Sequence, residues 1–147
     1  MTKSVIVTIP AYNEELTIGY LIKEIKAVTN NIKRYNFKIL VVNDGSTDST
    51  VKIAKENGAI VVSHPQNLGL AETYRTEIES CLKLNADIIV HIDADAQYVP
   101  SDIPRLLKKL EDGYDLVLGS RFLGIIEYMP LMKRLGNIAF SYVISNI

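Results

Sequence analysis

Short apolar runs rich in β-branched residues alternate with helical stripes along this sequence, and this alternation constrains the fold most strongly. The runs lie at residues 5–9, 37–42, 59–62, 88–92 and 115–119. Apolar residues at helical spacing lie between them; the first such set is Ile18, Leu21, Ile22, Ile25 and Val28. Strict alternation with short connections favours right-handed crossovers. We therefore expect an α/β fold, with a mostly parallel open sheet and helices on both faces.

Composition excludes several classes of protein. The 147 residues are 48% apolar and 22% charged, as in a folded domain with its own core rather than a disordered chain. A formal net charge of −1 without a basic run argues against a nucleic-acid partner. The single cysteine, Cys81, excludes an internal disulfide, suits a reducing compartment and is expected to fill the core.

Neither a signal peptide nor a membrane-spanning segment is expected. The first apolar run breaks at Tyr12-Asn13-Glu14-Glu15, too early for a secretory signal. No apolar stretch reaches the roughly 18 residues that cross a bilayer. We expect a cytoplasmic protein, with any membrane contact peripheral and at the cytoplasmic face.

Polar side chains follow four of the five predicted strands. They form the segments PAYNEE at 10–15, NDGSTD at 43–48, DADAQ at 93–97 and GSR at 119–121. Ligands of open parallel sheets bind outside the carboxyl ends of the strands, so these segments are the candidate site. The sequence has neither G-x-G-x-x-G after the first strand nor a P-loop, which argues against a nicotinamide cofactor or P-loop chemistry.

Asp93 and Asp95 are candidate ligands of a divalent cation. Side chains two residues apart point the same way if the chain stays extended, so the two carboxylates can share one ion. Oxygen ligands suit Mg²⁺ or Mn²⁺, which commonly take one or two carboxylates together with substrate phosphates. Gln97 can add a neutral oxygen. The alternative is a solvated loop that caps the next helix.

Each of the other polar residues at this edge has two possible roles, one in binding a ligand and one in the structure. Asp44 can accept hydrogen bonds from a base or ribose, or belong to an Asp-Gly turn. Tyr12 can stack on a base or pack, and Glu14 can contact a ligand or start a helix. Arg121 can clamp a phosphate or form an ordinary ion pair.

The two histidines are expected to be structural. His64 precedes Pro65 and is most simply a loop residue. His91 lies in a predicted strand and is expected to be a hydrogen-bonded core side chain rather than a base. No Ser/His/Asp or Cys/His triad is supported.

Taken in order, five motifs resemble family 2 glycosyltransferases, most closely the branch that transfers mannose or glucose to dolichyl or polyprenyl phosphate. They are IPAYNEE at 9–15, VVNDGSTDST at 41–50, NLG at 67–69, DADAQ at 93–97 and GSR at 119–121. The resemblance implies a GT-A fold, of which this chain covers the Rossmann-like nucleotide-binding half. It implies inverting, metal-dependent transfer of a hexose from a donor such as GDP-mannose or UDP-glucose to a lipid phosphate.

The resemblance also implies roles for the residues that bind the donor. Pro10, Tyr12 and Glu14 would line the nucleotide, and Asp44 would bind its base. Asp93 would help to bind both the diphosphate and the metal.

The reacting end of the site follows from the same resemblance. Asp95 would hold the Mg²⁺ or Mn²⁺ ion with Asp93, and Gln97 would assist at the metal. Arg121 would face the acceptor phosphate, which makes Asp95 and Arg121 the catalytic candidates. A phosphate acceptor is already ionised, so no dedicated base is needed.

This sequence departs from the family pattern in two ways. Glu72 and Glu77 stand where the family usually has a small residue and a glycine, and they could narrow the donor site or add negative charge. The family domain also continues beyond residue 147. We expect residues 1–121 to form the nucleotide-sugar-binding core and 122–147 to begin an incomplete acceptor-side segment. This segment is a candidate surface for a homo-oligomer.

Three other functions compete with this interpretation, and the sequence fits two of them poorly. A nucleotide-sugar-binding module without transfer activity is the main alternative. A sugar-1-phosphate nucleotidyltransferase would carry a glycine-rich basic first loop, whereas this loop is acidic. A receiver domain would place its acidic cluster after the first strand and one aspartate after the third, where this chain has Ser63-His64-Pro65.

Overall fold

The computed structural model describes residues 2–95 and 98–119, and within them it contains a parallel four-stranded sheet. The strands are β1 (Lys3–Ala11), β2 (Tyr35–Asn43), β3 (Ile60–Ser63) and β4 (Ile88–His91), in spatial order β3-β2-β1-β4. The chain therefore builds outward from β1 to β3 and then returns to the other side of β1. This reversal of strand order between β1 and β4 is where open α/β sheets bind ligands.

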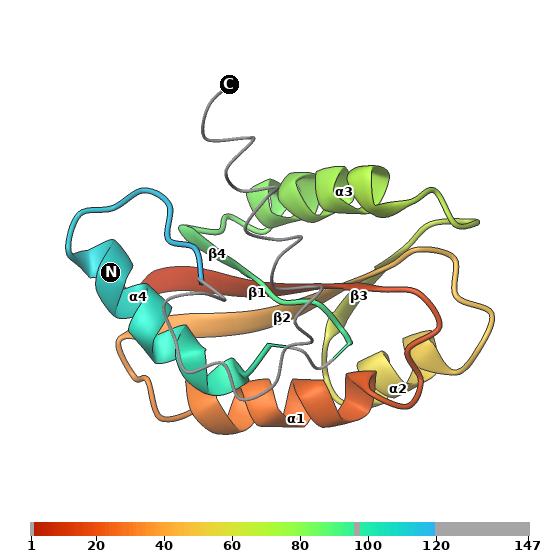
Figure 1. The fold of residues 1–147 in the computed structure, drawn as a ribbon, viewed down its shortest axis with the longest axis horizontal. Helices are drawn as coiled ribbons and strands as arrows, with labels where there is room; N and C mark the ends of the chain where they lie inside the picture. Colours follow the sequence, from red (N-terminus) through yellow and green to blue (C-terminus); the bar gives the residue numbers. More distant parts are fainter. Residues whose placement is uncertain (1, 96–97, 120–147) are drawn as a thin grey trace, which may run out of the picture. The chain divides into compact units, whose positions relative to one another are not determined.

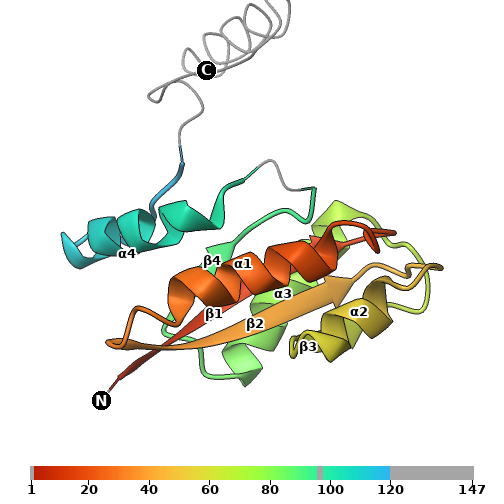
Figure 2. The ribbon, with the colours of Figure 1, turned by 90° about the horizontal axis from the view of Figure 1, so that it is seen from below.

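Helices cover both faces of the sheet, as the sequence predicts (Figure 1). One face carries α1 (Ile18–Thr29), α2 (Thr50–Glu56) and α4 (Ile103–Glu111), which follows a 3₁₀ turn at Pro100–Asp102. The opposite face carries α3 (Leu70–Lys83), and Figure 2 shows α1 and α3 on opposite sides of β1 and β2. The predicted fold class is confirmed.

The two faces contribute two apolar clusters of unequal size. The larger lies between the sheet and α1, because β-branched strand residues such as Val7 meet the helical stripe that contains Ile22. Ile103 and Leu107 bring α4 into the same cluster. The smaller lies under α3 and contains Cys81, which is fully buried and fills the core as predicted. Packing on both faces fixes the sheet, and with it the positions of the strand ends.

The expected fifth strand at 115–119 is wrong: these residues form no strand in the structure. They lie outside the compact unit that ends at Tyr114, and Leu116 and Leu118 are mostly exposed. A short apolar run becomes a strand only where a neighbouring strand and a packed face are available. Among the described residues, nothing pairs with this segment.

The predicted segment 122–147 lies outside the described residues. Within residues 2–95 and 98–119, no helix has both the length and the apolar character needed to cross a bilayer.

A tight turn at Gly45 brings the segment after β2 against the segment after β3. Gly45 adopts a φ of +73°, and the backbone of Gln66 and Asn67 lies so close that a Cβ atom would overlap it. Both the positive φ and the close approach therefore require glycine. Gly113 also has a positive φ, +100°, but has open space around its Cα.

Gly45→Ala should destabilise the fold much more than the matched variant Gly113→Ala. The positive φ costs about 1 kcal/mol in either variant, and the overlap with Gln66 adds about 2 kcal/mol at position 45 only. Urea denaturation of both variants measures the difference. Equal destabilisation of the two would show that the close approach does not constrain the turn.

Candidate functional site

A pocket of about 280 Å³ opens at the carboxyl ends of β1 and β4, where the strand order reverses. The segment after β1, the end of β2, the start of α3 and the segment after β4 all contribute to its walls. Its lining residues are Pro10, Ala11, Tyr12, Glu14, Asp44, Asn67, Gly69, Leu70, Thr73, Asp93, Ala94 and Asp95. The sheet topology thus brings together residues that are more than eighty positions apart in the sequence.

The pocket gathers six of the residues singled out from the sequence. They are Pro10, Tyr12, Glu14, Asp44, Asp93 and Asp95. Gln97 and Arg121 lie outside the described residues. The structure adds Leu70 and Thr73 from the first turn of α3, which the sequence did not single out because one apolar and one small polar residue carry no motif of their own.

The segments after β1 and β2 are joined by reciprocal hydrogen bonds. The Asn13 backbone N–H donates to Ser46 Oγ at 2.9 Å, and the Asn13 side-chain oxygen accepts from the Thr47 backbone N–H at 2.9 Å. The Glu15 N–H donates to Asp48, and the Glu15 carboxylate accepts from the Ser49 N–H. These bonds satisfy backbone groups that neither strand nor helix can pair.

Glu14 is a structural residue as well as a pocket residue. Its N–H donates to Thr50 Oγ1 at 2.8 Å, and its carboxylate accepts from the Thr17 hydroxyl at 2.6 Å. The Glu14 carbonyl accepts from the backbone N–H groups of Thr17 and Ile18. Glu14 thus supports the turn just before α1, which begins at Ile18, and it also lines the pocket, so its contact with a ligand stays a prediction.

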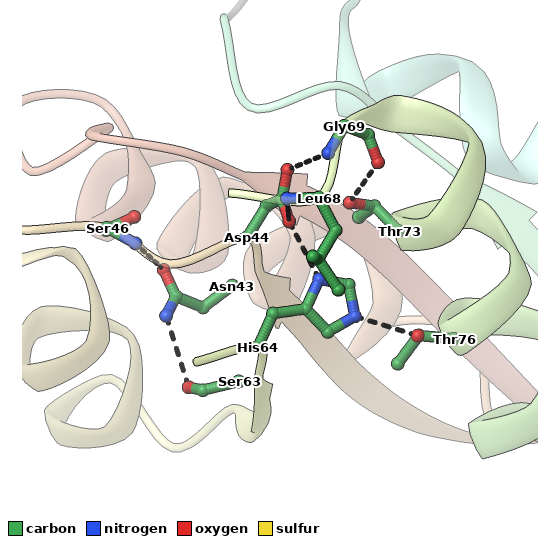
Figure 3. Close-up of polar contacts among 9 residues, drawn as sticks. All are labelled: Asn43, Asp44, Ser46, Ser63, His64, Leu68, Gly69, Thr73 and Thr76. Carbon is green, nitrogen blue, oxygen red and sulfur yellow. Dashed lines mark hydrogen bonds and ion pairs between the residues drawn. The ribbon is translucent and has the colours of Figure 1, made fainter. Parts of the chain in front are cut away.

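Asp44 lines the pocket and is the hub of a buried hydrogen-bond network (Figure 3). Its Oδ1 lies 2.7 Å from His64 Nδ1 and accepts from the Leu68 N–H at 2.8 Å. Its Oδ2 accepts from the Gly69 N–H at 2.9 Å. One carboxylate thus fixes the 67–69 segment, while Oδ2 keeps a lone pair for a ligand.

The network determines the ionisation of Asp44. Burial by itself would raise the pKa of the Asp44 carboxyl, but hydrogen bonds from His64, Leu68 and Gly69 together hold that pKa below its usual value. Asp44 is therefore a carboxylate at neutral pH, with its charge distributed over three donors.

His64 lies in the loop after β3, as expected, but its side chain is buried and hydrogen-bonded rather than exposed. It follows β3 directly, and its side chain is buried between Asp44 and Thr76, with Nε2 2.8 Å from Thr76 Oγ1. The signal was present in the sequence, because His64 follows a strand at the same sheet edge as the other candidate segments. His64 follows β3 in the same way as the candidate residues follow β1, β2 and β4, so the same rule makes it a candidate.

Tyr12 is half-exposed and lines the pocket, so a ligand can reach its ring. Stacking of Tyr12 on a base stays a prediction. Base stacking on an aromatic ring is one of the interactions by which proteins hold nucleotides.

Asp93 and Asp95 line the same pocket directly after β4. Within residues 2–95 and 98–119, no group of three or more His, Cys, Asp and Glu side chains could hold a metal by itself. Mg²⁺ and Mn²⁺ sites at phosphates need fewer, because the phosphates and water supply the remaining oxygens. Two accessible carboxylates in a pocket fit such an ion.

Neither glutamate that departs from the family pattern lines the pocket. Glu72 is partly exposed and lies 3.8 Å from Arg75. Glu77 is buried and contacts His91, whose imidazole also contacts Asp93. Hydrogen bonding of His91 is as expected, but the residue is not in the core, because 38% of its side chain is exposed.

Comparison with known proteins shows the family of this chain. The family model of glycosyl transferase family 2 matches residues 6–142, so the chain belongs to this family. It is 36% identical, over 96% of its length, to the UDP-N-acetylglucosamine--dolichyl-phosphate N-acetylglucosaminyltransferase of Methanococcus voltae. It is 35% identical, over 95% of its length, to a dolichyl-phosphate hexose transferase of Haloferax volcanii. The predicted family and its polyprenyl-phosphate branch are confirmed.

A solved structure shares the fold. Glucosyl-3-phosphoglycerate synthase from Mycobacterium tuberculosis, in complex with Mn²⁺, UDP and glucosyl-3-phosphoglycerate, matches 74% of this chain with a TM-score of 0.60 and 31% identity. The match covers 39% of that enzyme. This chain likewise spans 62% and 57% of the two archaeal relatives.

Asp44→Asn should destabilise the chain by about 1–3 kcal/mol at pH 7. An amide can replace one carboxylate oxygen, but its NH₂ group would then face a donor such as the Gly69 N–H. Urea denaturation of the variant and the wild type measures the effect.

The difference in free energy of unfolding between the wild type and Asp44→Asn should become smaller at acid pH. Because the pKa of Asp44 is lowered on folding, its ionisation stabilises the fold above about pH 4. This contribution is lost as the pH falls through the lower folded value. Denaturation from pH 7 to pH 3 tests the sign, and a difference that stays constant or grows in acid would contradict it.

Proposed function

We propose that this chain binds a nucleotide diphosphate sugar in the pocket between β1 and β4, for metal-dependent transfer of the sugar to a polyprenyl or dolichyl phosphate. The observation that carries the proposal is the pocket itself, which collects an aromatic ring and four acidic side chains at the point where the strand order reverses. The names of the dolichyl-phosphate relatives support this acceptor class.

The nucleoside would lie at the β1 side of the pocket. The exposed ring of Tyr12 offers a surface for the base, and the remaining lone pair of Asp44 Oδ2 can accept an N–H or hydroxyl from the base or ribose. Pro10 and Glu14 complete this wall. Because Asp44 is already held by three donors, it needs little reorganisation on binding.

The diphosphate would lie near Asp93 and Asp95. Without a cation, two carboxylates beside a diphosphate would repel it by about 4 kcal/mol per charge pair at 4 Å. Asp93 and Asp95 would hold Mg²⁺ or Mn²⁺, which supplies positive charge for the departing nucleotide diphosphate. We also assign Gln97 to this ion.

The transfer would be an inverting displacement. An oxygen of the lipid phosphate forms the new bond to the anomeric carbon while the bond from that carbon to the nucleotide diphosphate breaks. The acceptor oxygen is already ionised, so the chain need not remove a proton from it. We assign Arg121 to the acceptor phosphate, where a guanidinium can hold two of its oxygens.

Titration calorimetry with UDP and GDP, each with and without Mn²⁺, tests donor binding. The account predicts manganese-dependent binding of one nucleotide and a loss of at least about 10-fold in affinity on Asp95→Ala. Asp112→Asn removes an exposed carboxylate that pairs with Lys109 outside the pocket, and should leave the affinity unchanged.

Two outcomes would revise the proposal. Folded wild-type chain that binds neither nucleotide lacks the proposed donor site. Binding without sugar transfer to a polyprenyl phosphate would instead support the second function, a nucleotide-sugar-binding module.

A further inference from the structure

Glu77 is a buried carboxylate that the proposed donor site does not use. It lies on α3, its side chain is 1% exposed, and it does not line the pocket. Its Oε2 lies 3.0 Å from His91 Nδ1, whereas its Oε1 is buried without a hydrogen-bond partner. A buried carboxylate with an unsatisfied oxygen is costly, and an apolar side chain of similar size is often as stable or more stable. Stability alone therefore does not account for Glu77.

The second nitrogen of His91 connects Glu77 to the pocket. Nε2 lies 3.2 Å from Asp93 Oδ1, while the ring of Tyr74 packs edge-on against the imidazole. The imidazole is thus held at both nitrogens and on its ring. Three side chains form a continuous path from the buried side of α3 to a carboxylate of the pocket.

Asp93 lies beyond the last residue of β4, where strand pairing no longer fixes the backbone. The contact with His91 leaves Asp93 Oδ2 and the remaining lone pair of Oδ1 for other partners. A side chain in this position needs an external contact to hold one orientation, and His91 supplies it.

We propose that Glu77 and His91 are positioning residues: Glu77 fixes the imidazole of His91, and His91 holds the Asp93 carboxylate ready for a divalent cation and the donor diphosphate. This inference rests on the proposed function, because it assigns Asp93 to the cation. Partners of this kind around a ligating side chain typically change metal affinity by about 10- to 100-fold when they are removed.

The hydrogen-bond chemistry identifies a conservative and a disruptive variant at position 77. In Glu77→Gln, the amide N–H can donate to His91 Nδ1, which leaves the proton on Nε2 to donate to Asp93. In Glu77→Met, the side chain keeps its length and fills the same space but offers no hydrogen bond. The two variants separate the hydrogen bond from packing.

The test uses UDP or GDP, whichever nucleotide the wild-type chain binds. Calorimetry measures the manganese-dependent affinity of each variant for this nucleotide, and urea denaturation measures its stability. Glu77→Met should weaken binding by about 10-fold and be as stable as the wild type or more stable. Glu77→Gln should stay within about 3-fold of the wild type, because it restores the hydrogen bond to His91.

A double variant tests whether Glu77 acts through His91. His91→Phe keeps a ring against Tyr74 but cannot contact Asp93, so it should weaken binding as much as Glu77→Met does. Adding Glu77→Met to His91→Phe should change the affinity by less than about 2-fold, because both substitutions break the same path. In the metal-free chain, Glu77→Met should also shift the ¹⁵N resonances of the His91 imidazole.

The outcomes distinguish failure of this inference from failure of the proposed function. Wild-type binding that Glu77→Met leaves unchanged overturns the positioning role alone, and so does equal weakening by Glu77→Gln and Glu77→Met. Folded wild-type chain without manganese-dependent binding of either nucleotide overturns the proposed function and, with it, this role of Glu77.

Discussion

The parallel pairing of β1 with both β2 and β4 is the constraint on which the rest of the structure depends. Because β1 is central and all its neighbours run in the same direction, the carboxyl ends of the strands meet at one edge. The order reverses beside β1, and the segments after β1 and β4 both line the pocket at this edge. Apolar packing by α1 and α3 on the two faces holds this arrangement in place.

Electrostatics determine what such a pocket can hold. Four acidic side chains line it, and they are not equivalent. The carboxylates of Glu14 and Asp44 accept hydrogen bonds from Thr17 and from the 67–69 segment, which makes them part of the framework. Asp93 is held from the side by His91, and Asp93 and Asp95 lie together at the end of β4. A diphosphate beside this second pair would need a cation to offset the repulsion, which is the physical reason for proposing a metal-dependent donor site.

Much of the fold and the candidate site could be predicted from the sequence, and the exceptions have identifiable causes. Periodicity predicted β1 to β4, since each is a mainly apolar run rich in β-branched residues and helical patterns separate the runs. It failed at 115–119, where the short apolar run that contains Leu116 and Leu118 would become a strand only if a neighbour paired with it. The polar residues at the strand ends predicted most of the pocket, whereas Leu70, Thr73 and the buried contact of His64 with Asp44 carry no motif of their own. No local pattern shows that Glu77 lies against His91, because this contact depends on how α3 packs over the sheet.

Anomalous diffraction from crystals of the chain with Mn²⁺ and the nucleotide that binds it tests the central claim most directly. The account predicts a manganese peak within about 2.2 Å of carboxylate oxygens of Asp93 and Asp95, with the base against Tyr12 and Asp44. A manganese peak away from these carboxylates, or a nucleotide bound outside the pocket between β1 and β4, would contradict it.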